Sequence, residues 1–253
     1  MNTQAFSTVE TGYLHIVASD FDARPMTYVE QGQRSGYEPE LARLVCQKLG
    51  LEPIWHNTRM EKFYSSMQTG HYDVVWFNQA ITPERQQWVD FTRPYGLFDE
   101  SVLVKVESPV QSAADLAGLR VGGLADSTNL ALAATFPGVT VVPYPGSDKV
   151  LPEMLEALRN GEIDALIDDE LVLVVAAEED ASLRMAFEVP TRVPFGIGVQ
   201  KGNVALHQAI ESALNALIAN GTVATLWERW IPWKPFPFVE EIKQPVLTDT
   251  NLI

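Results

Sequence analysis

Residues 72–85 read YDVVWFNQAITPER, and this stretch joins an apolar run to a charged turn. The near-continuous apolar run at 72–77 predicts a strand that is covered on both faces, as in a parallel sheet. Thr82 and Pro83 are the residue types of a helix N-cap and a first helical position. Arg85 opposes the positive end of a helix dipole, and it comes soon after the carboxyl end of the strand. A residue that breaks a local rule at such a place is often kept for function, so Arg85 is a candidate site residue.

Two interpretations of Arg85 remain open at this point. Its guanidinium could hold a carboxylate through two parallel hydrogen bonds, and a charge-assisted bond contributes about 1.5–3 kcal/mol. Alternatively, Arg85 is a surface arginine that pairs with Asp90 or Glu84. The residues alone do not choose between a binding role and a surface ion pair.

On both sides of this stretch, strand patterns alternate with helix patterns. Strands are predicted at 14–18, 72–77, 102–105, 120–123, 139–144, 163–167 and 196–200. Helices are predicted within 36–50, at 61–69, after Ser127, and at 150–159, 205–220 and 222–230. This alternation predicts an α/β fold built from parallel β-α-β units. The proline-rich segment 232–253 is expected to pack along the surface as irregular chain.

Two more candidate sites stand where predicted strands end. Ser127 and Thr128 begin a helix just after the strand at 120–123, where backbone N–H groups and hydroxyls can bind an anion, although Ser127 could equally be an ordinary cap. Asp169 follows the strand at 163–167, and ligands of open α/β sheets bind beyond such strand ends. Its carboxylate could receive an ammonium group. Arg85, Thr128 and Asp169 together would supply the two poles that a zwitterionic amino acid requires.

Composition excludes several classes of protein. The chain has 253 residues, and 33 acidic against 18 basic residues give a net charge of −15, which argues against nucleic-acid and anionic-membrane partners. The single cysteine, Cys46, allows neither an intrachain disulfide nor a zinc site with several thiolates. No apolar run approaches the roughly 18 residues of a membrane span. Residues 1–12 lack the basic and apolar segments of a signal peptide, so we expect a mature or trimmed chain.

Catalytic and cofactor motifs are not found in the sequence. Neither G-x-S-x-G nor G-x-x-x-x-G-K-[ST] occurs, and the four histidines have no metal-ligand spacing. We therefore expect no catalytic residue, no metal site and no cofactor.

An ordered series of segments resembles the polar-amino-acid solute-binding proteins of ABC importers, over roughly residues 14–232. The series is GYEPELARLVCQKLG (36–50), HYDVV (71–75), ITPERQQWVDFTRPY (81–95), SPVQSAADLAGLRVGGLADST (108–128), LEALRNGEIDALIDDE (155–170), FGIGVQKGN (195–203) and IANGTVATLWERW (218–230). The resemblance implies a periplasmic-binding-protein-like fold, in which two α/β lobes joined by a two-stranded hinge close over one ligand in the interlobe cleft. Residues 1–96 and 194–253 would form the first lobe, and residues 97–193 the second.

Site residues are carried over from the resemblance by position. Arg85 would bind the α-carboxylate of the ligand, with help from Ser127 or Thr128. Asp169 would receive the α-ammonium group, together with the backbone carbonyl of Asn78.

The resemblance also implies further contacts with the ligand, at positions where this chain matches the family's pattern less closely. Asp20 and residues 22–24 lie in the loop after the first strand, which often contacts ligand, and Met60 stands where an aromatic side chain often stacks. Ala80 lacks the hydroxyl that the family usually offers to the carboxylate, and Phe77 belongs to a segment that is bulkier than usual. These two departures favour a smaller pocket or an atypical ligand, such as an amino-acid derivative.

The expected function is capture of a polar amino acid or a derivative outside the cytoplasm, by a monomer that delivers it to the membrane subunits of an ABC importer. One alternative is the ligand-sensing domain of a membrane receptor. Another is an enzyme on the same scaffold that eliminates water and carboxylate from a cyclohexadienyl acid. Such chemistry needs a further acid or base in the cleft, and residues 171–175, which follow Glu170, are all apolar.

Overall fold

The computed structural model describes residues 6–242, and the end of the predicted irregular tail, residues 243–253, lies outside them. The strands are β1 (Tyr13–Ala18), β2 (Tyr28–Glu30), β3 (Gln33–Ser35), β4 (Glu52–Asn57), β5 (Val74–Val75), β6 (Val89–Phe91), β7 (Gly96–Lys105), β8 (Arg120–Leu124), β9 (Thr140–Tyr144), β10 (Ala165–Asp169), β11 (Leu183–Phe195) and β12 (Gly198–Gln200). The α-helices are α1 (Tyr37–Leu49), α2 (Phe63–Met67), α3 (Thr128–Ala133), α4 (Val150–Asn160), α5 (Glu170–Glu179), α6 (Val204–Ala219) and α7 (Thr222–Trp230). Short 3-10 helices are η1 (Met60–Lys62), η2 (Arg85–Gln87), η3 (Ala113–Leu116) and η4 (Val239–Glu241). Among residues 6–242, no helix combines the length and the apolar character that crossing a membrane requires.

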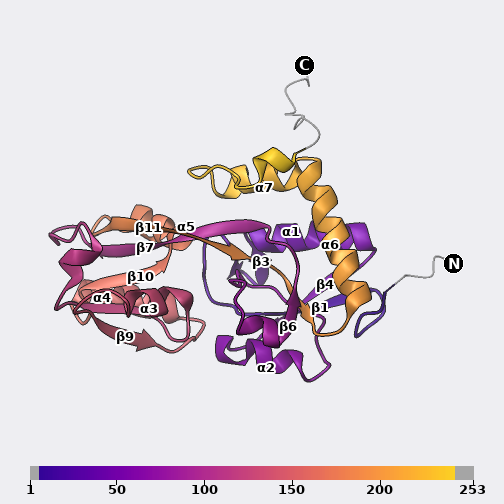
Figure 1. Ribbon diagram of the computed structural model, residues 1–253, viewed down its shortest axis with the longest axis horizontal. Coiled ribbons are helices and arrows are strands. Elements are labelled where there is room, and N and C mark those ends of the chain that lie inside the picture. Colours follow the sequence, from indigo (N-terminus) through magenta and orange to yellow (C-terminus); the bar gives the residue numbers. More distant parts are fainter. Residues whose placement is uncertain (1–5, 243–253) are drawn as a thin grey trace, which may run out of the picture.

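Two five-stranded sheets organise these elements into two lobes, which lie at opposite ends of the long axis in Figure 1. The first sheet has the order β4-β1-β5-β12-β6, and the second has the order β11-β7-β10-β8-β9. In the first sheet β12 runs antiparallel to the other four strands, and in the second sheet β7 runs antiparallel to the other four. The α/β fold with two lobes is therefore confirmed, and the parallel arrangement expected from the sequence holds except at β7 and β12.

The two-stranded hinge is the antiparallel pair β7 and β11, which runs between the lobes (Figure 1). Its register runs from Lys105 opposite Leu183 to Gly96 opposite Phe195. Gly96 has to be small, because a Cβ atom there would overlap the ring of Phe195. The sequence did not predict the long strand β11, because Pro190 interrupts its strand pattern and much of the strand is half-exposed.

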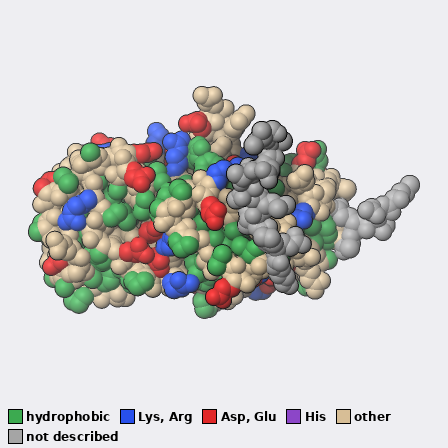
Figure 2. Space-filling view, turned by 90° about the horizontal axis from the view of Figure 1, so that it is seen from above, with side chains coloured by type: hydrophobic (Ala, Val, Ile, Leu, Met, Phe, Trp, Pro, Cys, Tyr) green, Lys and Arg blue, Asp and Glu red, His purple; other side chains and the backbone are tan. Residues whose placement is uncertain are grey.

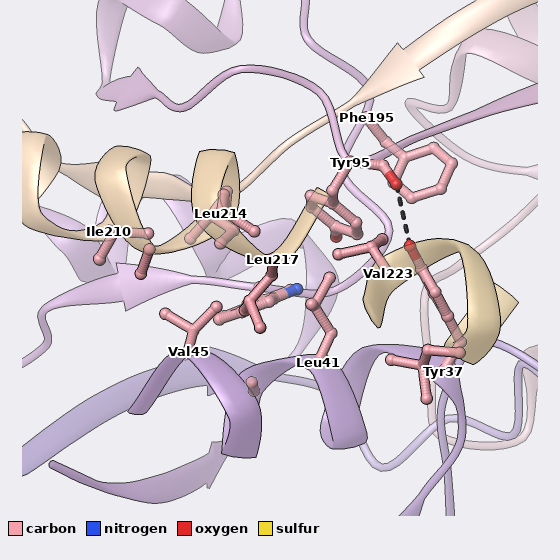
Figure 3. Close-up of a cluster of buried hydrophobic side chains, with 14 of the residues drawn as sticks. Tyr37, Leu41, Val45, Tyr95, Phe195, Ile210, Leu214, Leu217 and Val223 are labelled. Carbon is pink, nitrogen blue, oxygen red and sulfur yellow. Dashed lines mark hydrogen bonds between the residues drawn. The ribbon is translucent and has the colours of Figure 1, made fainter. Parts of the chain in front are cut away.

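The core of the first lobe lies where α1 packs against α6 and α7 (Figure 3). Leu41 and Val45 of α1 face Leu214 and Leu217 of α6, and all four are almost fully buried. Tyr37, at the start of α1, donates a hydrogen bond from its hydroxyl to the carbonyl oxygen of Tyr95, at 2.9 Å. This contact fixes the N-terminus of α1 beneath the junction of the lobes.

The C-terminal segment after α7 is tied to the hinge by a partly buried cluster of charges. Lys234 Nζ lies 2.8 Å from Asp99 Oδ2 on β7 and 2.7 Å from Glu170 Oε2 at the start of α5. Trp233 Nε1 also donates to Glu170, at 3.3 Å. Elsewhere charges are dispersed: on the face in Figure 2, acidic and basic side chains are interspersed, and no patch of one sign stands out.

The predicted elements mostly occur, and two differ in a way that matters for the site. The predicted strand at 72–77 is shorter in the structure, where β5 is two residues long, and Asn78, three residues after its end, takes a left-handed conformation with φ 46°. The helix expected after Thr82 is a single 3-10 turn, η2. Thr82 Oγ1 still accepts a hydrogen bond from the Arg85 N–H, at 3.2 Å, so the capping interaction is present without the helix.

Candidate functional site

A cavity of about 70 Å³ lies between the lobes, beyond the carboxyl ends of β5 and β10. Its lining combines one arginine, two aspartates, several amides and hydroxyls, and a group of apolar side chains. The lining residues are Phe21, Ala23, Met60, Phe77, Asn78, Gln79, Ala80, Arg85, Phe98, Leu124, Ser127, Thr128, Asn129, Val150, Asp168, Asp169 and Val172. An arginine and a pair of aspartates in so small a space make it suited to a small molecule that carries charges of both signs.

Arg85 lines the cavity and is held by the segment that leads into η2. Its Nη1 donates to the carbonyl oxygen of Ala80 at 3.1 Å, and its guanidinium lies 5.6 Å from the centre of the Tyr64 ring. Neither Asp90 nor Glu84 pairs with Arg85 within residues 6–242, and Asp90 faces Lys201 instead. The surface ion pair is therefore the weaker interpretation, since the guanidinium keeps donors for a ligand anion.

Ser127 and Thr128 lie at the start of α3, on the same cavity. Ser127 is the N-cap, because its Oγ accepts from the Leu130 N–H at 3.1 Å and donates to the carbonyl oxygen of Leu124 at 2.7 Å. Its hydroxyl is therefore already occupied by the helix start. Thr128 makes no side-chain hydrogen bond to the residues that the structure describes, so its hydroxyl is the freer of the two.

Asp169 ends β10 and sits at the opposite pole of the cavity. Its Oδ1 accepts from Asn129 Nδ2 at 2.8 Å, and its Oδ2 accepts from Asn78 Nδ2 at 2.5 Å. Burial, followed by repulsion from Asp168, raises the pKa of Asp169 well above its ordinary value. Burial also raises the pKa of Asp168 to about 6, and its Oδ1 accepts the backbone N–H of Asp169 at 2.8 Å. A pair of carboxyl groups in this state is stabilised by a cation that replaces the lost solvent.

Asn78 connects the first lobe to Asp169, and its own position depends on a buried glutamate. The Asn78 N–H donates to Glu38 Oε1 at 2.7 Å, and the Tyr95 hydroxyl donates to the same oxygen. Glu38 lies in the first turn of α1 and is only 1% exposed. Burial raises its pKa to about 7, although the Tyr95 hydroxyl and the Asn78 N–H hold it down in part.

The remaining residues expected from the sequence divide into two groups. Met60, Phe77 and Ala80 line the cavity. Asp20 is not part of the lining, because its carboxylate pairs with the buried guanidinium of Arg34. Of residues 22–24, only Ala23 reaches the cavity.

Several residues of the cavity were not predicted from the sequence. Gln79 and Asn129 are nearly buried amides that line the cavity. Glu38 does not line it, but it accepts a hydrogen bond from the backbone of the cavity residue Asn78. Asn129 directly follows the candidate residues Ser127 and Thr128, so its place in the same helix start could have been used to predict it. Glu38 gave no signal, since an acidic residue in the first turn of a helix is ordinary. No group of three or more potential metal ligands occurs within residues 6–242.

Comparison with known proteins identifies a family model and relatives that agree with each other. The family model described as bacterial extracellular solute-binding proteins, family 3, matches residues 15–232. The L-cystine-binding protein TcyJ of Escherichia coli (strain K12) is 30% identical over 205 residues, which cover 79% of this chain and 76% of TcyJ.

Solved structures agree with this result. An ancestral arginine-binding protein bound to glutamine superimposes with a TM-score of 0.80 at 27% identity, covering 88% of this chain and 99% of that one. The ancestral amino acid-binding protein AncCDT-1, a precursor of cyclohexadienyl dehydratase, gives a TM-score of 0.78 at 25% identity, covering 87% and 95%. Since the family model spans most of the chain, the protein belongs to family 3 of the bacterial extracellular solute-binding proteins.

Proposed function

We propose that this protein captures an amino acid or a close derivative between its lobes and delivers it to the membrane subunits of an ABC importer. The observation that carries the proposal is the pair of opposite poles, Arg85 and Asp169, across one interlobe cavity. The names of the relatives, which bind cystine, arginine and glutamine, support the same class of ligand. As in the family, the protein would work outside the cytoplasmic membrane, as a monomer.

Each pole has a proposed role. Arg85 binds the α-carboxylate, with the Thr128 hydroxyl at the facing wall. Asp169 receives the α-ammonium group, together with the backbone carbonyl of Asn78. The first lobe would comprise residues 1–96 and 194–253 and the second residues 97–193, so that each pole belongs to a different lobe and the ligand favours closure.

The cavity favours a small ligand whose side chain is uncharged. Arg85, Asp168 and Asp169 are the charged groups of the lining within residues 6–242, and the two aspartates are neighbours at one pole. The rest of the wall is largely apolar, from Phe21 and Met60 on one side to Val150, Val172 and others on the opposite side. A second cation or anion on the ligand would find no separate partner there, and burying it unpaired is costly.

A thermal-shift screen of the common L-amino acids and L-cystine tests the function. A ligand at 100 times its Kd should stabilise the protein by about 2.7 kcal/mol. The Arg85→Ala variant should then bind the best of these ligands about 2–4 kcal/mol more weakly in calorimetry, because the carboxylate loses its partner. Arg59→Ala removes an arginine that is 67% exposed next to the cavity residue Met60, and it should bind normally. Unchanged affinity in Arg85→Ala would rule out Arg85 as the anchor.

Two alternatives are less favoured by the comparisons, and each can be tested. The carboxyl groups of Asp168 and Asp169 have raised pKa values inside the cavity, which is a property that general acids share. Turnover of prephenate or arogenate in an absorbance assay would establish the dehydratase-like enzyme in place of a binding protein without catalysis. A receptor sensor domain would bind ligand in the same way and would differ by its attachment to a membrane segment.

A further inference from the structure

Arg85 has weak support from its own backbone. It begins η2, a single 3-10 turn of three residues, and it is half-buried at the cavity wall. One hydrogen bond of its side chain goes to a backbone carbonyl, that of Ala80. A long, flexible arginine needs further contacts to hold its guanidinium in one orientation, because freezing such a side chain costs conformational entropy.

Tyr64 supplies such a contact from α2. The Arg85 guanidinium lies 5.6 Å from the centre of its ring, within the range of a cation–π interaction. Tyr64 is not part of the cavity lining, so it supports the guanidinium from behind. Its pKa is raised strongly by burial, so the phenol is neutral and its hydroxyl is a hydrogen-bond donor at ordinary pH.

The hydroxyl of Tyr64 is used to fix a second cavity residue. It donates to Gln79 Oε1 at 2.6 Å, and Gln79 Nε2 in turn donates to the carbonyl oxygen of Phe77 at 2.6 Å. Gln79 is only 8% exposed and lines the cavity. Both ends of its amide are therefore held, while the amide nitrogen has a second N–H beyond the one given to Phe77.

We propose that Tyr64 is a positioning residue for the carboxylate pole: its ring orients Arg85, and its hydroxyl fixes the Gln79 amide beside Arg85. Neither contact touches the ligand directly, so the effect of Tyr64 on binding passes through Arg85 and Gln79. This inference rests on the proposed role of Arg85 in binding a carboxylate. It adds residues outside the cavity to the determinants of affinity.

Two substitutions separate the two contacts of Tyr64. Tyr64→Phe keeps the ring and removes only the hydrogen bond to Gln79, whereas Tyr64→Leu removes the ring as well. Each is made alone and combined with Arg85→Ala. Tyr72→Leu is the matched control, because Tyr72 is a half-buried tyrosine that packs against His56, and it does not line the cavity.

The probe is whichever of the common L-amino acids and L-cystine binds the wild-type protein most tightly in calorimetry. Tyr64→Leu should raise its Kd by about five- to thirtyfold, as loss of a cation–π contact and a hydrogen bond implies. Tyr64→Phe should give a smaller increase, and Tyr72→Leu should give none. In the Arg85→Ala background, Tyr64→Leu should change Kd much less than it does alone. An equal effect in both backgrounds, or an unchanged Kd in Tyr64→Leu, would overturn the inference.

A cycle without any probe makes the outcome independent of the proposed function. Urea unfolding of wild type, Tyr64→Leu, Arg85→Ala and the double variant measures the coupling between the ring and the guanidinium. Non-additive changes in unfolding free energy support the inference even if none of the amino acids tested binds, whereas additive changes contradict it. If Tyr64→Leu does not fold, Tyr64→Phe with Gln79→Met tests the hydrogen-bonded half in the same way.

Discussion

Replacing Glu38 with glutamine should flatten the dependence of the protein's stability on pH. Glu38 is almost fully buried, and burial raises its pKa from an ordinary 4.5 to about 7. Because the folded state holds this proton more tightly than the unfolded state, protonation of Glu38 stabilises the fold. The contribution is fully present below pH 4.5 and is lost as the pH rises through 7.

The magnitude follows from the two pKa values. At about 1.36 kcal/mol for each tenfold change in proton affinity, the rise to about 7 corresponds to about 3 kcal/mol in total. Most of it, about 2.5 kcal/mol, falls between pH 5 and pH 8. Glu38→Gln is always neutral, so the fall in its unfolding free energy between these pH values should be smaller by that amount. The carboxamide oxygen can still accept from the Asn78 N–H and the Tyr95 hydroxyl.

The assay is urea unfolding of both proteins at pH 5, 6, 7 and 8. Asp168 and Asp169 contribute in the same direction, so only the difference between wild type and variant isolates Glu38. Glu156→Gln removes an exposed carboxyl group from α4 and should leave the wild-type profile unchanged. Parallel profiles for wild type and Glu38→Gln would refute the reasoning, since Glu38 would then be ionised in the folded protein over the whole range.

Two further predictions concern the hinge. Lys234→Ala leaves Asp99 and Glu170 without their shared cation. Because both carboxylates are nearly buried, the free energy of unfolding should fall by about 3 kcal/mol. A loss under 1 kcal/mol in urea unfolding would show that the two carboxylates become hydrated instead. Gly96→Ala forces a methyl group into the ring of Phe195, so we expect about 1–3 kcal/mol of destabilisation in the same measurement. An unchanged midpoint for that variant would mean that the hinge strands can separate at little cost.

The fold was largely predictable because its helices and buried strands have strong periodic patterns. The face of α1 marked by Leu41 and Val45 packs as expected, and Ser127 caps α3 as its residue type predicts. The antiparallel pairing of β11 with β7 was missed for a physical reason. β11 is half-exposed and contains prolines, so its pattern resembles a loop, and only pairing along β7 makes it a strand.

Residues of the candidate site could be predicted only where a residue type is unusual for its local structure or stands at a position where ligands often bind. Arg85 stood out because a cation opposes the expected helix start, and Asp169 stood out at a strand end. Glu38 and Tyr64 contribute to the site through contacts made by distant parts of the chain, at Asn78 and Gln79. Each looks like an ordinary helix residue in sequence, so only the tertiary arrangement reveals what it does.

On the proposed function, the buried state of Asp169 would link ligand binding to closure of the lobes. Its carboxyl group is shielded from water in the interlobe cavity, and this burial disfavours the charged form and raises the pKa of Asp169. Hydrogen bonds from Asn78 and Asn129 offset only part of that cost, because neutral amides compensate a charge less well than a cation does. On the proposed function, the ligand ammonium supplies the missing charge when the lobes come together. A molecule without a cationic group would leave that cost in place, so the same aspartate that binds the ligand would also make closure depend on it.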